Sequence, residues 1–213
     1  MSLDGYRTAV GERLAVLLSG VEVRMRMYPN DLQAWLEHGD FETMHGAGDT
    51  RGNPRRCDRI KVEEMVLDVP RYVEEKARPR YGYAQGSRED GRVNLYGEVL
   101  VRLHDQVRAI SNVLLGDSMG STNIAEYACT GPARLDEPQL ICRFSSADVL
   151  QAAGLAEACD PYFLYAEIQI YGSLRAESIK QVLFCNGLAI PVDLSRLLNR
   201  LDVAHERIPD YQL

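Results

Sequence analysis

The sequence predicts an α+β protein, a single domain over residues 1–213, and three observations support this class. Most segments with the period-two pattern of strands follow residue 78. Helical patterns are gathered near the N-terminus, so helices and strands do not alternate as they do in a βαβ fold. A hydrophobic content of 46% in a chain of 213 residues is enough for one sizeable core.

The N-terminal region is predicted to form a helix, a strand and a second helix. Residues 2–20 place apolar side chains at helical spacing. Residues 21–28 alternate apolar and charged side chains, which predicts a strand with Arg24 and Arg26 on one face. Residues 30–39 begin with a capping asparagine and end at a glycine, so we expect a short helix there.

A long loop is expected next, because residues 40–59 hold several glycines, a proline and mixed charges. A loop of this length inside a compact domain usually serves a site. A basic cluster lies at its end, made of Arg51, Arg55, Arg56, Arg59 and Lys61. This cluster is either solvated or faces an anionic ligand. A short helix around residues 61–68 is predicted to follow.

The remaining pattern predicts strands separated by short helical segments. Strands are expected over residues 78–83, 93–104, 107–115, 139–144, 162–172 and 181–185. Helical turns are expected over residues 122–129, 145–153 and 173–178. A final helix begins at Asp193, and its expected buried side consists of Leu194, Leu197, Leu198 and Leu201.

The most strand-like segment of the chain is residues 162–172. Its alternation places Leu164, Ala166, Ile168 and Ile170 on one face, which we expect to be core. The opposite face carries Tyr165, Glu167, Gln169 and Tyr171. This polar face is either the solvated side of an antiparallel sheet or the floor of a cleft.

The composition argues against membrane and nucleic-acid partners. No apolar run approaches the length needed to cross a bilayer. A net charge of −7 is unfavourable for binding a phosphate backbone as the main partner. The five cysteines are odd in number and form no CxxC pair, so neither a metal site nor a disulfide framework is indicated. We expect free thiols in a reducing cytosol.

Several short segments recur in an order known from one enzyme family. They are Arg26-Met27-Tyr28-Pro29-Asn30-Asp31-Leu32, Gly39-Asp40-Phe41-Glu42-Thr43, Arg78-Pro79-Arg80-Tyr81-Gly82, Leu115-Gly116-Asp117-Ser118 and Tyr165-Ala166-Glu167-Ile168-Gln169-Ile170-Tyr171-Gly172. The ordered set covers roughly residues 24–185 and resembles bacterial and phage-associated mono-ADP-ribosyltransferases. The resemblance implies a split α/β fold, with two antiparallel sheets around a cleft for NAD, the co-substrate.

The resemblance also implies site residues. Glu167 matches the catalytic glutamate of a late strand, where a carboxylate stabilises the oxocarbenium-like centre formed when nicotinamide leaves. Arg26 matches the early-strand arginine that holds a pyrophosphate or ribose, with Arg24 on the same face as the alternative. Tyr81 and Tyr83 are candidates for stacking on nicotinamide. A further candidate ligand contact is Ser118.

The chain departs from the family pattern where the acceptor is chosen. Many members of that family carry Glu-x-Glu or Gln-x-Glu. Here Tyr165 lies two residues before Glu167, and Gln169 lies two residues after it. Both Tyr165 and Gln169 are expected near the substrate. The stretch 46–52 has no Ser-Thr-Ser motif. Arginine is therefore in doubt as acceptor. The set also resembles effectors that ADP-ribosylate threonine of host ubiquitin, and a hydroxyl acceptor fits the missing second acid.

Three functions follow as alternatives. The first is a protein mono-ADP-ribosyltransferase, cytoplasmic or, as a bacterial effector or toxin, secreted into a host cytosol. The second is a transferase-like scaffold that binds a partner or nucleotide without catalysis. The third is an NAD glycohydrolase, which uses the same site with water as acceptor.

Overall fold

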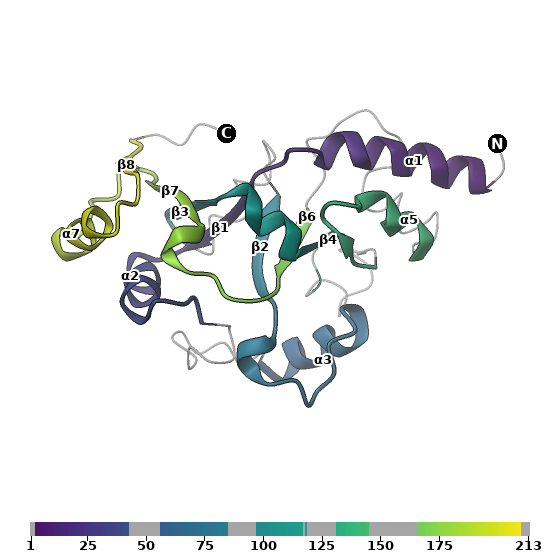
Figure 1. Cartoon of the computed structure of the whole chain (residues 1–213), viewed down its shortest axis with the longest axis horizontal. Helices are drawn as coiled ribbons and strands as arrows, with labels where there is room; N and C mark the ends of the chain where they lie inside the picture. The colour runs from purple at the N-terminus through teal and green to yellow at the C-terminus, as the bar shows by residue number, and fades with distance from the viewer. Residues whose placement is uncertain are drawn as a thin grey trace.

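The computed structural model describes residues 3–42, 56–84, 97–116, 118, 131–144 and 166–209. Within them the protein is a mixed α and β structure with one eight-stranded sheet (Figure 1), in the order β5-β4-β6-β2-β1-β3-β7-β8. The strands are β1 (Val23–Met27), β2 (Arg80–Ala84), β3 (Val99–Leu103), β4 (Ser111–Leu115), β5 (Ala133–Arg134), β6 (Ala166–Ile170), β7 (Ile179–Phe184) and β8 (His205–Arg207). The α-helices are α1 (Leu3–Leu18), α2 (Pro29–His38), α3 (Arg56–Val66), α5 (Ile141–Phe144) and α7 (Val192–Arg200).

The described strands form one sheet, whereas the resemblance implies two. The reason is a short ladder in which β1 pairs with β2, Val23 opposite Ala84 and Arg24 opposite Tyr83. This ladder joins the half β5-β4-β6-β2 to the half β1-β3-β7-β8. Gly82 permits the junction, since a Cβ there would lie 2.6 Å from a backbone oxygen of β1. The expectation of antiparallel pairing holds except between β7 and β8, which are parallel.

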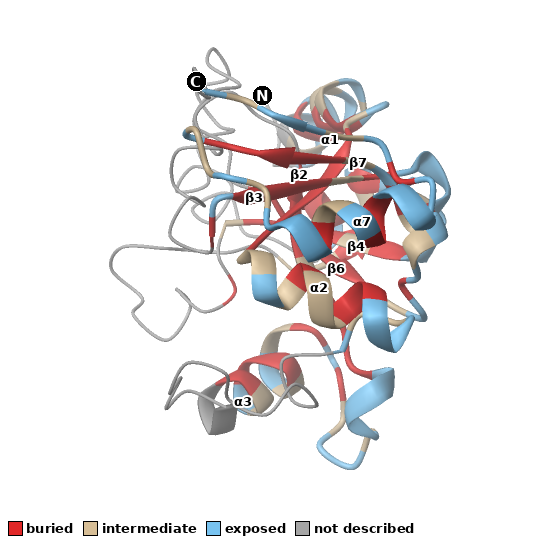
Figure 2. Cartoon of the chain, turned by 90° about the vertical axis from the view of Figure 1, so that its left-hand side faces the viewer, coloured by how far each residue is buried: buried red, intermediate tan, exposed pale blue. Residues whose placement is uncertain are grey.

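One face of the sheet packs on helices and forms the hydrophobic core. On the strands it consists of alternate residues such as Met25, Val101 and Ile168, all buried. Helices α1, α2 and α7 cover this face with apolar stripes, of which Leu14 and Trp35 are members. The amphipathic pattern is visible in Figure 2, where the strands are coloured as buried and the outer turns of α2 and α7 as exposed.

The residues that alternate with the core residues form the opposite face of the sheet, called the second face below. It carries Arg24, Arg26, Tyr83, Glu167 and Gln169, and all of these are buried as well. Part of its cover comes from α3, which lies across the molecule from α1 in Figure 1 and whose side chains contact residues of β2. On β6 the second face is therefore buried, and the alternative of a solvated sheet face is wrong for the described part of this strand.

Most elements of the N-terminal half agree with the sequence pattern. Helix α1, strand β1 and helix α2 lie within their predicted ranges or differ by one residue, and Gly39 ends α2 with a φ of 83°. Helix α3 begins at Arg56, although residues 40–59 were expected to be loop. No helix in the described part of the chain is long and apolar enough to span a bilayer.

Three expectations for the later elements are wrong. Residues 107–115 are not one strand, because the 3-10 helix η3 (Asp105–Ile110) precedes β4. Residues 139–144 are helical, since Pro138 starts the 3-10 helix η5 (Pro138–Leu140), which continues into α5. Leu201 is 38% exposed, because α7 ends before it. The described part of the chain also contains the 3-10 helices η1 (Glu75–Ala77) and η7 (Ala176–Ser178).

Some expectations lie outside the described residues. These are residues 43–55 of the expected loop, with Arg51 and Arg55, the turn over 122–129, the helix over 145–153, the first part of the strand over 93–104, and residues 162–165 of the central strand.

Candidate functional site

A single row of side chains crosses the second face from β6 to β7. Tyr83 pairs with Glu167 on one side and with Arg24 on the other. Arg24 in turn pairs with Arg102, and Arg102 with Gln181. Directly paired residues project to the same face of a sheet. With strands about 4.8 Å apart, Glu167 and Arg24 are separated by roughly 10 Å along this row.

Glu167 lies at the β6 end of this row, and its carboxylate is held by hydrogen bonds. Its carboxylate accepts hydrogen bonds from the backbone N–H of Ser118 at 3.2 Å and from the Ser118 hydroxyl at 2.6 Å. The amide of Gln169 donates a third bond at 2.8 Å. Glu167 is 3% exposed, so these neutral donors replace water and hold the carboxylate in one orientation.

Helix α3 supplies a guanidinium and a carboxylate to the same region. Arg59 donates from Nη1 to the Ser118 hydroxyl at 2.7 Å, and its guanidinium lies 4.0 Å from the centre of the Tyr81 ring. Glu63, one turn further along α3, accepts a bond from the Tyr81 hydroxyl at 2.7 Å. Arg78 completes the chain with a buried ion pair to Glu63 at 2.6 Å. Arg59, a member of the basic cluster described above, is therefore buried in the protein.

Two tyrosines beside these carboxylates are held in the neutral form. Burial raises the pKa of Tyr81 far above its usual value, and Glu63 adds to the rise. Burial likewise raises the pKa of Tyr171 to about 12, with Glu63 and Glu167 contributing, although Asn112 opposes the shift. Both phenols therefore keep their protons at neutral pH, and the Tyr81 hydroxyl donates a hydrogen bond to Glu63.

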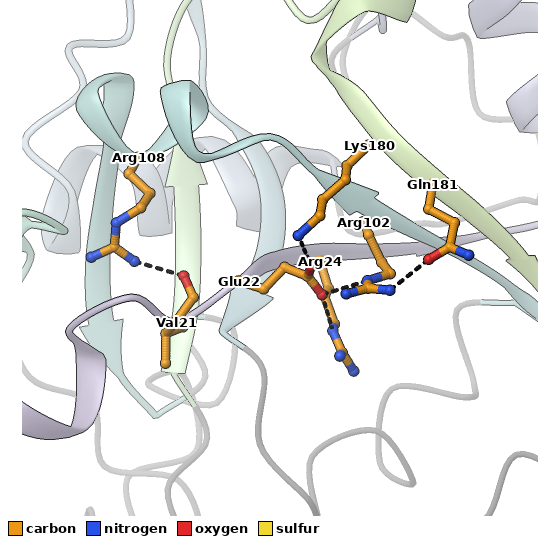
Figure 3. A network of polar contacts seen from close by, with 7 residues as sticks. All are labelled: Val21, Glu22, Arg24, Arg102, Arg108, Lys180 and Gln181. Atoms are coloured by element: carbon orange, nitrogen blue, oxygen red, sulfur yellow. Dashed lines mark hydrogen bonds and ion pairs between the residues drawn. The ribbon is translucent and has the colours of Figure 1, made fainter. Parts of the chain in front are cut away.

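The basic end of the row is organised around a second buried carboxylate, Glu22 (Figure 3). It forms ion pairs with Arg24 at 3.1 Å, Arg102 at 2.7 Å and Lys180 at 3.1 Å. We call these four residues the Glu22 cluster. Burial raises the pKa of Glu22, but hydrogen bonds from the three cations outweigh it and lower the pKa to about 2. Glu22 is thus ionised at any physiological pH.

The environment of Arg26 differs from that of Arg24. The second face around it is a small apolar cluster that includes Tyr83, Leu100, Leu183 and Cys185. Burial lowers the pKa of the Arg26 guanidinium, but Tyr83 and Cys185 raise it above its usual value. Arg26 therefore remains charged within an apolar setting next to the row.

The predicted site residues converge to a large extent. Glu167, Gln169, Ser118, Tyr81, Tyr83, Arg24 and Arg26 all lie on or against the second face. Tyr165 lies outside the described residues. The roles of all these residues stay predictions. Arg59 and Glu63 were not in the predicted site, although their spacing of four residues would place them on one face of a helix.

Comparison of the chain with models of known protein families gives no match, and comparison with curated proteins gives none either. The function is therefore inferred from the second face itself. There, a fixed carboxylate lies beside aromatic rings, with guanidinium groups further along the same row. This combination suits a ligand with a centre that becomes positive during reaction and with anionic groups nearby.

Proposed function

We propose that the protein is an NAD-dependent mono-ADP-ribosyltransferase with Glu167 as its catalytic carboxylate. The observation that carries the proposal is the environment of this residue: buried, held by Ser118 and Gln169, and aligned through Tyr83 with Arg24. The sequence resemblance names the same residue, and its buried carboxylate, fixed by hydrogen bonds, supports that role. The fold adds no support, because the described strands form one sheet whereas the resemblance implies two.

The proposed reaction begins with cleavage of the bond between nicotinamide and its ribose. Nicotinamide leaves with the bonding electrons, and positive charge develops on the ribose carbon. Glu167 stabilises this charge and accepts a hydrogen bond from a ribose hydroxyl. An acceptor hydroxyl then bonds to the same carbon and loses its proton. The products are an ADP-ribosylated protein, nicotinamide and a proton.

The neighbouring groups have roles consistent with this chemistry. Arg26 is placed to hold a ribose or phosphate beside Tyr83, and its charge persists at all relevant pH values. The Tyr81 ring offers a surface for the nicotinamide ring, although Arg59 lies over one of its faces. Gln169 and Tyr165 are the candidates for contact with the acceptor. We propose a protein hydroxyl as acceptor, with threonine of host ubiquitin as the first to test.

A non-catalytic scaffold is the second candidate, and one observation favours it. Glu167, Ser118, Arg59 and Tyr81 form a continuous chain of buried contacts, which would also suit a purely structural network. Such networks stabilise and specify a fold without any chemistry. The two candidates differ in what happens when the charge of Glu167 is removed.

The test is incubation of the protein with labelled NAD, with and without ubiquitin and a eukaryotic lysate, while nicotinamide release and protein labelling are measured. The variant Glu167→Gln removes the charge and keeps the shape. We expect its turnover to fall by about 100-fold or more. Glu37→Gln, which neutralises an exposed glutamate of α2, is the matched control and should behave as wild type.

The outcomes separate the three functions. A labelled protein band that depends on Glu167 supports the transferase and provides the acceptor for mapping. Release of nicotinamide without a band indicates an NAD glycohydrolase. A folded wild-type protein that is silent in both assays indicates the scaffold. Equal turnover of wild type and Glu167→Gln would remove Glu167 from the mechanism.

A further inference from the structure

The Glu22 cluster contains more positive than negative charge. Three cations contact this one carboxylate, and two of them, Arg102 and Lys180, already outnumber it. The whole chain has a net charge of −7, so the excess does not reflect the overall composition. A local surplus of cations in an acidic protein is a favourable position for an anion.

The cluster also has donors that its own carboxylate does not use. Arg102 donates from Nε to Glu22 and from Nη1 to Gln181. Among the described residues, its Nη2 donates no hydrogen bond. Lys180 donates one bond to Glu22 and is 45% exposed, while Arg102 is 29% exposed. An incoming anion can therefore reach both cations without breaking the ion pairs.

Two members of the Glu22 cluster lie on the same face of the sheet as Glu167. Arg24 and Arg102 belong to the row that contains Tyr83 and Glu167, on the same face of the sheet. From Glu167 the row reaches Arg24 after two strand spacings, roughly 10 Å, and Arg102 after three, roughly 14 Å. A ribose with its 5′-diphosphate covers much of such a separation, and the long side chains of Arg102 and Lys180 can cover the rest.

We propose that the Glu22 cluster binds the diphosphate of the dinucleotide, with Arg102 and Lys180 as the direct phosphate donors. This inference rests on the proposed function, because it uses Glu167 to position the reacting ribose. Guanidinium and ammonium groups are the usual partners of phosphate oxygens. Arg24 is 8% exposed, so it lies too deep for a flat protein surface and is better reached by a small ligand.

The behaviour of Glu22 supports a strong positive field at this place. Its carboxylate is buried, which by itself raises the pKa, yet the surrounding cations lower the pKa to about 2. An anionic ligand near Arg102 and Lys180 would be stabilised by the same cations that lower the pKa of Glu22. Glu22 keeps the cations together before the ligand arrives, so their side chains need little reordering on binding.

The experiment measures binding by calorimetry with ADP-ribose and with adenosine, which lacks the diphosphate. We expect Arg102→Ala to weaken ADP-ribose binding by about tenfold and Lys180→Ala by about threefold, with adenosine binding unchanged. Arg196→Ala removes an exposed arginine of α7 whose ion pair lies on its own helix, and it serves as the matched control. Lys180 is half-exposed, so its variant should fold even if Arg102→Ala is destabilised.

Each result has a separate meaning. ADP-ribose affinity lost in both variants supports the diphosphate site, and this conclusion stands even if wild type releases no nicotinamide from NAD, in which case the proposed transferase fails. Unchanged ADP-ribose affinity in both variants, with nicotinamide release intact in wild type, overturns the diphosphate site and leaves the transferase standing. Unchanged ADP-ribose affinity with weaker labelling of the acceptor protein also overturns it, and assigns the cluster to an acidic acceptor surface.

Discussion

Glu22 and Glu167 are both buried carboxylates on the second face, but their partners differ. Glu22 is held by three cations, whereas among the described residues the hydrogen-bond donors to Glu167 are the neutral groups of Ser118 and Gln169. Direct ion pairs cancel a charge and make the carboxylate part of the framework. Neutral donors fix a carboxylate in place without cancelling its charge, which is the arrangement that electrostatic catalysis requires.

The largest effect that separates the two carboxylates is expected on folding stability. Glu22→Ala leaves three neighbouring cations without their shared counter-ion, so we expect the free energy of unfolding to fall by about 3 kcal/mol or more. Denaturant unfolding measures it. Truncating Asp193, the exposed partner of Arg196, should cost less than about 0.5 kcal/mol and provides the control. A loss for Glu22→Ala as small as the control would mean that the cluster does not stabilise the fold.

The second effect is a dependence of stability on pH. The pKa of Glu22 is about 2 in the folded protein, against an ordinary value of 4.5, so the depressed pKa contributes stability above pH 4.5. This contribution is lost as the pH falls from 4.5 toward 2, and we expect about 2 kcal/mol after allowing for solvent screening. Unfolding curves at several pH values measure it. The same curves for Glu22→Gln should lack this component; identical pH profiles for the two proteins would contradict the assignment.

Only part of this arrangement of side chains on the second face can be predicted from the sequence. Alternation within residues 21–28 and 162–172 is enough to place Arg24 with Arg26, and Glu167 with Gln169, because period two is a local property of a strand. The register that aligns Glu167 with Arg24 through Tyr83 joins strands distant in sequence, and no local pattern specifies it.

Other parts of the site were missed for different physical reasons. Arg59 lies in a segment whose glycines and charges indicate a loop, yet tertiary packing on Tyr81 and Ser118 stabilises a helix there. The apolar run over residues 139–144 is too short for its period to distinguish a strand from a buried helix. Pro138 decides in favour of the helix.

The third effect concerns the neutral donors of Glu167. Ser118→Ala removes the hydroxyl that donates to Glu167 and accepts from Arg59, so we expect a loss of about 1 to 2 kcal/mol in stability. If the hydroxyl positions Glu167, kcat for nicotinamide release should also fall by about tenfold while KM for NAD changes little. Steady-state kinetics test this. Ser118→Thr keeps a hydroxyl and should recover much of kcat, whereas a purely structural serine would change stability alone.

The smallest effect is expected from Arg59→Lys, which keeps the charge but loses the planar group over Tyr81. The stacked guanidinium lies 4.0 Å from the ring centre, and a lysine retains a cation–π attraction without the stacking. We expect a stability loss of about 0.5 to 1 kcal/mol, measured by denaturant unfolding. Arg175→Lys changes an exposed arginine and should be neutral. If Arg59→Lys is also neutral, Arg59 contributes to the Glu167 region through its charge alone, and the environments of Glu22 and Glu167 differ less than their hydrogen-bond partners indicate.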